Sequence, residues 1–285
     1  MFRRAQATNY SGPVIDVGII TGSGVSEFPG NSETHLVKNT FGHVEVAVSK
    51  VGPWTVGSIA RHQSGHRHLP NTIPYRANLT AMKQLGARAM LPTTAVGAVD
   101  SGLTLGRPIV FDDLFFPANV LPNGEVCTIF TAPGDPERGH LIWAEPFAPS
   151  LRRKLELAAW ELGLEVTSGG TYGHTNGPRF ETRAEIRWLD AAGVAAVSQT
   201  CGPEIVLAGE LGIAYGLVGF PVNYATGVAK HESEEELARM LELTSEITPR
   251  LVSKAAQILE EEDLVFDHGY VYRFDQVARA DAEPG

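Results

Sequence analysis

The sequence is short of cysteine and of long apolar runs, and each shortage excludes a class of protein. Its two cysteines, Cys127 and Cys201, cannot build a disulfide framework and lack the paired spacing of a zinc ribbon. The longest nearly apolar stretch, 213–222, has about half of the ~20 residues that a membrane helix needs. No apolar segment follows the two arginines near the N-terminus, so they do not indicate a secretory signal. We therefore expect a cytoplasmic protein that does not cross a membrane.

Basic charge is also scarce. The chain has 33 acidic and 23 basic side chains, a formal net charge of −10. Nucleic acids and anionic membrane surfaces are bound by basic surfaces, so neither is an expected partner. An anionic ligand would need a local positive pocket within this acidic chain.

The residues that are present predict one α/β domain. No repeat or linker divides the 285 residues, so we expect a single domain over 1–285 with loose ends at 1–12 and 276–285. Short β-rich runs alternate with helical patterns, which indicates an α/β architecture, either doubly wound or more closed. The expected strands are 14–20, 43–51, 55–60, 89–94, 108–111, 125–130, 194–199 and 213–222, and a charged final helix is expected to begin near Ser233.

Two short motifs suggest anion binding, each weakly. Ser23 lies between two glycines directly after the first expected strand, where backbone N–H groups can approach an anion, although the motif alone is better explained by a tight turn. Thr93 and Thr94 stand at the end of another expected strand.

A basic cluster at 61–68 is the strongest local signal. It places Arg61 and Arg67 among three histidines, and guanidinium and imidazole groups can donate hydrogen bonds to phosphate. His62, His66 and His68 could instead bind a metal ion, which is the competing hypothesis. We favour the anion, because two arginines would repel a cation.

Six ordered segments together resemble a known family. They are GIITGSG, ARHQSGHRHLPNTIPYRAN, PTTAVGAV, GHLIWAEPF, NGPRFETRAE and QTCGPEIVLAGELGIAYG followed by NYATG. In this order they are similar to the trimeric purine nucleoside phosphorylases, and within them to the methylthioadenosine or methylthioinosine phosphorylase branch. The resemblance runs from about Val17 to Leu243.

The resemblance implies a fold, a reaction and an assembly. The fold would be a single-domain phosphorylase/hydrolase-like α/β fold with a central mixed twisted β-sheet flanked by helices. The reaction would be cleavage of the N-glycosidic bond of a purine nucleoside by inorganic phosphate, without a metal or organic cofactor. The active enzyme would be a homotrimer with a shared active site.

Carried over residue by residue, the resemblance also implies a site. Phosphate would be bound by Ser23, Arg61, His62, Thr94, Ala95 and Thr200, and the catalytic set would be Asn223, His62 and Arg61.

The base would be read by Phe180, Glu181 and Asn223. An amide at 223 can donate to a 6-oxo group and accept from N7–H, and a carboxylate at 181 can accept from N1–H, which adenine lacks. A 6-oxopurine is therefore the expected base, as in inosine or guanosine.

The sugar and its 5′ group would be met by Tyr75, His140, Gln199 and Glu234, with His140 reaching a neighbouring subunit. Tyr75 has core packing as an equal alternative. Gln199 stands where the family usually has methionine, and Glu234 stands where it selects the 5′ group. Both changes favour a polar 5′ group.

Three alternatives stay open at this point. The same chemistry on a 5′-modified nucleoside such as methylthioinosine or methylthioadenosine is the nearest. A metal-dependent hydrolase and a non-catalytic nucleoside-binding relative are the other two.

Overall fold

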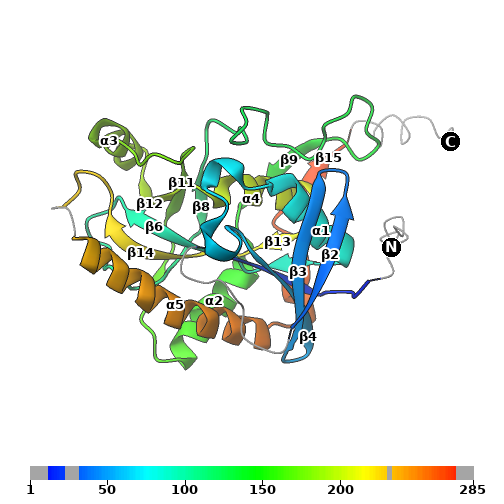
Figure 1. Ribbon diagram of the computed structural model, residues 1–285, viewed down its shortest axis with the longest axis horizontal. Helices are drawn as coiled ribbons and strands as arrows, with labels where there is room; N and C mark the ends of the chain where they lie inside the picture. Colours follow the sequence, from blue (N-terminus) through cyan, green and yellow to red (C-terminus); the bar gives the residue numbers. More distant parts are fainter. Residues whose placement is uncertain (1–11, 23–31, 230–232, 274–285) are drawn as a thin grey trace, which may run out of the picture.

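The computed structural model describes residues 12–22, 32–229 and 233–273. In these residues the strands form two large sheets and one small one, with helices on both sides (Figure 1). The predicted α/β architecture with mixed sheets flanked by helices is confirmed. Nearly all of the two ends predicted to be loose, together with Ser23, lies outside the described residues.

The first sheet has six strands. Its parallel part, β13-β5-β1-β4, continues into an antiparallel meander, β4-β3-β2. In sheet order the strands are β13 (Ala214–Tyr215), β5 (Ala89–Met90), β1 (Val17–Thr21), β4 (Trp54–Ala60), β3 (Gly42–Val51) and β2 (Glu33–Asn39). Because β1 and β4 are parallel, with Thr21 opposite Ala60, both end at the same edge.

The second sheet has seven strands and mixes parallel and antiparallel pairs. In order they are β10 (Thr167–Ser168), β7 (Ile109–Val110), β14 (Val218–Tyr224), β6 (Thr93–Ala98), β12 (Val194–Ser198), β11 (Thr171–His174) and β8 (Asp113–Phe115).

Two expected strands, 89–94 and 213–222, are each split in the structure. Each begins in the first sheet, as β5 or β13, and continues in the second, as β6 or β14. The crossing occurs at Pro92, which has no N–H for a sheet ladder, and at Gly216, whose N–H donates to Met90 O at 3.0 Å. The two sheets are therefore joined along this line.

Helices enclose the joined sheets (Figure 1). On one side α2 packs on α5, and their apolar faces share a core with β1. On the other side α1 packs on α4 over a second core. The helices are α1 (Tyr75–Leu85), α2 (Pro149–Glu161), α3 (Arg183–Ala191), α4 (Cys201–Glu210) and α5 (Glu234–Gln257), with 3₁₀ turns at Ser64–His66, Pro70–Thr72 and Glu261–Leu264. None of the helices in the described ranges is long and apolar enough to span a membrane.

The predicted start of the last helix is confirmed. Ser233 is its N-cap, accepting from Glu236 N while the Glu236 carboxylate accepts from Ser233 N.

The expected strand at 125–130 is wrong. This segment is irregular, with only an isolated bridge between Val120 and Val126. Side chains satisfy its backbone instead: Arg76 donates to Thr128 O at 2.8 Å, and Glu210 accepts from Ile129 N at 2.6 Å. The nearby small sheet pairs β9 (His140–Trp143) with β15 (Gly269–Tyr272).

Candidate active site

Three of the predicted anion-binding segments touch at the edge where β1 and β4 end. Gly22 follows β1, and a Cβ there would lie 3.0 Å from Nη1 of Arg61, 3.1 Å from Thr93 O and 3.4 Å from the Cα of Thr94. Only glycine leaves this space open. Segments that are far apart in the sequence therefore converge on one small volume.

A buried carboxylate, that of Glu204, holds the side chain of Arg61. Its side chain is 1% exposed and makes a bidentate ion pair with Glu204, which is 0% exposed, at 2.6 Å from Nε and 2.9 Å from Nη2. The Tyr215 hydroxyl donates to the same carboxylate at 2.9 Å. Burial alone would lower the pKa of Arg61, but Glu204 raises that pKa well above its usual value, so the guanidinium stays charged.

Most of the guanidinium is occupied. Nη1 also donates to Thr93 O at 3.0 Å, and Nη2 lies 3.5 Å from Sγ of Cys201. A guanidinium has five N–H donors. These four contacts leave one N–H, on Nη1, without a partner among the described residues, and Nη1 is the atom that faces Gly22.

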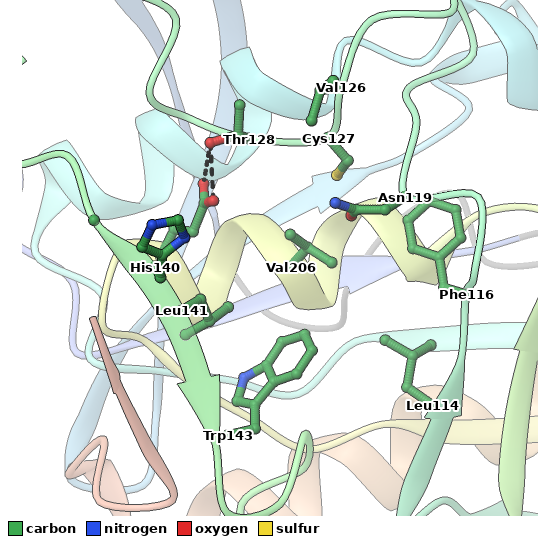
Figure 2. A pocket seen from close by; sticks show the side chains of 12 residues that line it. Leu114, Phe116, Asn119, Val126, Cys127, Thr128, His140, Leu141, Trp143 and Val206 are labelled. Carbon is green, nitrogen blue, oxygen red and sulfur yellow. Dashed lines mark hydrogen bonds between the residues drawn. The ribbon is translucent and has the colours of Figure 1, made fainter. Parts of the chain in front are cut away.

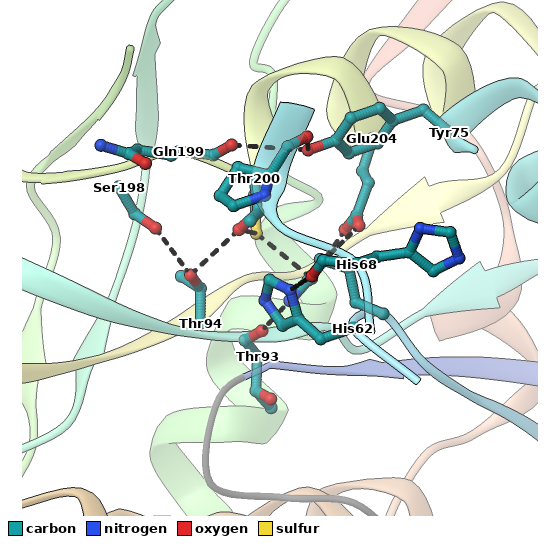
Figure 3. Close-up of polar contacts among 12 residues, drawn as sticks. His62, His68, Tyr75, Thr93, Thr94, Ser198, Gln199, Thr200 and Glu204 are labelled. Atoms are coloured by element: carbon teal, nitrogen blue, oxygen red, sulfur yellow. Dashed lines mark hydrogen bonds and ion pairs between the residues drawn. The ribbon is translucent and has the colours of Figure 1, made fainter. Parts of the chain in front are cut away.

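Three hydroxyl groups complete this part of the site (Figure 3). Oγ1 of Thr94 lies 3.0 Å from Oγ of Ser198 and 3.3 Å from Oγ1 of Thr200. Thr200 is the N-cap residue of α4, so the positive end of that helix dipole lies at the same place. Thr94 also donates to the carbonyl of Ala95 at 3.1 Å.

His62 lies next to this cluster as a neutral imidazole. It is 8% exposed, and its Nδ1 is 2.7 Å from the carbonyl of His68, which makes Nδ1 the protonated nitrogen. Burial, and then the charge of Arg61, lower the pKa of His62 to about 4. Its Nε2 is therefore a hydrogen-bond acceptor at neutral pH.

The basic cluster at 61–68 is divided in the structure. Arg61 and His62 are buried in the site, whereas His66 and Arg67 are exposed. Because Glu204 neutralises Arg61, this region carries less positive charge than the sequence predicted. Within the described ranges, no three His, Cys, Asp or Glu side chains come together as metal ligands, and Nδ1 of His68 faces the Thr72 hydroxyl at 3.2 Å.

A second group of residues surrounds Glu181, in the segment between β11 and α3. One carboxylate oxygen, Oε1, accepts from the Thr175 hydroxyl and from Nε2 of Gln199 at 3.3 Å. The other oxygen, Oε2, has no partner among the described residues. Glu181 thus presents an acceptor.

Asn223 lies across β6 from the end of β12. Its register partner on β6 is Gly97, which also pairs with Val197 of β12. Two strand spacings, roughly 10 Å, therefore separate Asn223 from the end of β12. Nδ2 of Asn223 donates to Tyr224 O at 2.8 Å, and within the described ranges its Oδ1 has no partner.

Two aromatic candidates have opposite environments. Phe180, beside Glu181, is 75% exposed. Tyr75, the first residue of α1, is buried, and its hydroxyl donates to the carbonyl of Gln199 at 3.4 Å (Figure 3). Tyr75 is therefore part of the core next to the site. Phe180 is exposed, so a ligand can contact its ring.

His140 and Glu234 do not join the other candidates in this chain. His140 begins β9 and lines a separate pocket beside the C-terminal part of α4, with Thr128 and Glu210 close by (Figure 2). Glu234 is exposed in the first turn of α5.

Sequence reasoning missed three polar side chains of the site. Glu204 was seen only as part of a motif, and Ser198 and Thr175 were not considered as site residues. A carboxylate in the first turn of the otherwise apolar helix α4 was the one available signal, because a buried carboxylate needs a partner. Nothing in the spacing identified that partner, which lies 143 residues away.

Comparisons with known proteins identify the family of this chain. A sequence model of the phosphorylase superfamily matches residues 16–261. The 6-oxopurine nucleoside phosphorylase of Pyrococcus furiosus is 34% identical over 252 residues, covering 86% of this chain and 94% of that one. The S-methyl-5′-thioadenosine phosphorylase of Mycolicibacterium smegmatis is 33% identical over 252 residues, covering 86% and 92%.

Solved structures support the fold. A methylthioadenosine phosphorylase from an antarctic soil metagenomic library has a TM-score of 0.80 at 23% identity, covering 93% of this chain and 95% of that chain. Together with the sequence relatives, this shows that the chain belongs to the phosphorylase superfamily, and within it to the group that contains the 6-oxopurine nucleoside and methylthioadenosine phosphorylases.

Proposed function

We propose that this enzyme cleaves the N-glycosidic bond of a 6-oxopurine nucleoside with inorganic phosphate. The bond between C1′ and the purine nitrogen breaks, a phosphate oxygen bonds to C1′, and the electron pair leaves with the base. The products are the free base and a pentose 1-phosphate. Relatives at 33–34% identity are named for this type of reaction.

The open acceptor oxygens of Glu181 and Asn223 support a 6-oxopurine as the base. Glu181, which is hydrogen-bonded to Gln199 just after β12, has a carboxylate oxygen without a partner among the described residues, and Asn223 on β14 has such a carbonyl oxygen. The carboxylate would accept from N1–H, and Asn223 would stabilise N7–H as the base departs.

The candidate phosphate site, called the anion pocket below, consists of Arg61, Thr94, Thr200 and the N-terminus of α4. Arg61, Thr94 and Thr200 surround a volume that also receives the α4 dipole. Phosphate bound there would stabilise the positive charge that develops on the sugar, so that the protein needs no nucleophile of its own. Ser23 would complete the pocket, and Nε2 of His62 would accept a hydrogen bond from the P–OH group of singly protonated phosphate.

Inosine with and without phosphate tests the reaction. We expect hypoxanthine and ribose 1-phosphate to form in equal amounts, and no turnover without phosphate. Formation of free ribose would identify a hydrolase. Nucleoside binding without any product would identify a non-catalytic relative.

A 5′-methylthio nucleoside is the second candidate substrate. Gln199 was expected to make the sugar pocket polar, but its amide is engaged by Arg179 O and Glu181. The argument for a polar 5′ group is weaker as a result. Comparing kcat/KM for inosine and 5′-methylthioinosine decides between the two substrates.

We also propose that the enzyme is a homotrimer acting in the cytoplasm. The family resemblance places His140 at the sugar of a neighbouring chain, and in this chain it is exposed and lines a pocket separate from the rest of the site. Light scattering should give three chains per particle, and a monomer with full activity would contradict the shared site.

A further inference from the structure

Gln199 connects the anion-binding strand end to the base-reading segment. It stands between Ser198 and Thr200, whose hydroxyls meet Thr94, and its own side chain leaves the strand end in a different direction (Figure 3). The amide Nε2 donates to the carbonyl of Arg179 at 2.7 Å and to Oε1 of Glu181 at 3.3 Å. At 8% exposed, this side chain is part of the interior.

Both hydrogen bonds of Gln199 end on the segment that carries Glu181. Thr175 donates to the same Oε1. Two donors on Oε1 fix the plane of the carboxylate, and Oε2 is left as the oxygen that can accept from a ligand. The carboxylate is thereby oriented before a base arrives.

The amide of Gln199 also packs closely against Gly177, in the same segment of the chain. A Cβ at Gly177 would collide with Oε1 of Gln199 and would lie 2.8 Å from its Cδ. The absence of a side chain at 177 is what leaves space for a glutamine at 199. The two positions therefore form a fitted contact rather than a chance approach.

We propose that Gln199 is a positioning residue for base recognition, which holds Glu181 so that Oε2 meets N1–H of a 6-oxopurine. This inference rests on the proposed function. It assigns Gln199 to the base, although the family resemblance had assigned that position to the sugar. Without the amide, Glu181 would keep only the Thr175 hydrogen bond and would have to be ordered by the substrate itself, at the expense of binding energy.

The test compares two nucleosides that differ at N1. Inosine has N1–H, and purine riboside does not. Gln199→Met removes the donor at similar length, and Gln199→Glu keeps the shape but replaces the donor with a carboxylate. We expect each variant to lower the ratio of kcat/KM for inosine to that for purine riboside about tenfold, the effect of one hydrogen bond to a charged group. KM for phosphate should stay within about threefold of the wild-type value, because the hydroxyls of the anion pocket are untouched.

A matched control separates positioning from general loosening. Glu185 ties down the same segment through Arg179 and the backbone of Thr182, but it does not contact Glu181. Glu185→Gln should leave the inosine to purine riboside ratio unchanged. Thr175→Val, which removes the second donor to Oε1, should lower the ratio in the same direction as the Gln199 variants.

An unchanged ratio in folded Gln199→Glu and Gln199→Met proteins would overturn the inference, as would an equal fall in Glu185→Gln. If the Gln199 variants do not fold, Thr175→Val decides in the same way. Wild-type protein that forms no pentose 1-phosphate from any purine nucleoside would instead refute the proposed function, so the two failures are distinguishable.

Discussion

The anion pocket and the base-reading segment are built in opposite ways. In the anion pocket, Arg61 and Glu204 are at most 1% exposed and form a bidentate pair. In the base-reading segment, Arg179 and Glu185 form a bidentate pair of similar lengths, 2.7 and 2.9 Å, that is largely exposed. The same chemical pair is therefore a fixed part of the core in one region and a surface contact in the other.

This difference separates two tasks. In the anion pocket, contacts within the protein hold the side chains of Arg61 and Thr94 in place, as electrostatic stabilisation of a transition state requires. The base-reading segment, between β11 and α3, keeps an acceptor open on Glu181 and carries the exposed ring of Phe180. Asn223, on β14, keeps a second acceptor open. Specificity for the base therefore depends on acceptor oxygens that have no hydrogen-bond partner within the described part of the protein.

The sequence predicted the first region better than the second. The family resemblance placed Arg61, Thr94 and Thr200 together, as expected for an α/β protein in which strand ends meet at one edge. Glu204 could not be identified as the partner of Arg61, because a contact between residues 143 positions apart leaves no local pattern. The role of Gln199 depends on a side-chain direction, and composition and spacing do not contain that information.

The fold was predictable to a similar extent. Helix starts with clear caps, such as Ser233, were found correctly. The irregular segment at 125–130 was predicted as a strand because its composition is β-rich. Its backbone is instead hydrogen-bonded by Arg76 and Glu210, which are distant in sequence and leave no local signal. The split of 89–94 and 213–222 between two sheets follows from tertiary packing and is invisible to a window of ten residues.

Breaking each of the two ion pairs should show the largest difference between the two regions, measured as the free energy of unfolding. Glu204→Gln leaves Arg61 as an uncompensated buried charge, and we expect the free energy of unfolding to fall by about 3–5 kcal/mol. Glu185→Gln breaks the exposed pair and should leave the free energy of unfolding nearly unchanged, because solvent screens that pair. Urea unfolding of both variants measures this, and equal losses would contradict the contrast between the two regions.

Acid should destabilise the protein through its buried histidines. Burial lowers the pKa of His174 to about 3, and burial and Arg61 lower the pKa of His62 to about 4. The unfolded chain binds protons near pH 6.5 and the folded chain does not, so stability is present above that pH and is lost as the pH falls towards the folded values. We expect a loss of roughly 3 kcal/mol for each histidine between pH 7 and pH 4. His174→Gln should remove the roughly 3 kcal/mol that this histidine contributes to the loss, and an unchanged pH dependence would contradict the assignment.

Changing the base-reading residues should change specificity without changing the anion pocket. Asn223→Asp with Glu181→Ser replaces the acceptor for N1–H and gives position 223 a carboxylate that can accept from a 6-amino group. We expect the ratio of kcat/KM for inosine to that for adenosine to fall by about 100-fold, since one or two hydrogen bonds to charged groups are exchanged. Retained inosine preference in the double variant would show that the base is read elsewhere.

Filling the space at Gly22 should give the smallest and most local effect. In Gly22→Ala the new Cβ would approach Nη1 of Arg61 and the backbone of Thr93. We expect KM for phosphate to rise about tenfold, an ordinary cost of overpacking. The inosine to adenosine ratio should not move. A change in the inosine to adenosine ratio would instead show that Gly22 affects recognition of the base.

Phosphate binding to the free protein tests the preformed anion pocket most directly. Isothermal titration of phosphate into wild-type protein, with nucleoside absent, should show saturable binding at one site per chain. Its Kd should lie within about threefold of the phosphate KM, because Arg61, Thr94 and Thr200 are already assembled. Phosphate that binds only after a nucleoside has been added would contradict the account.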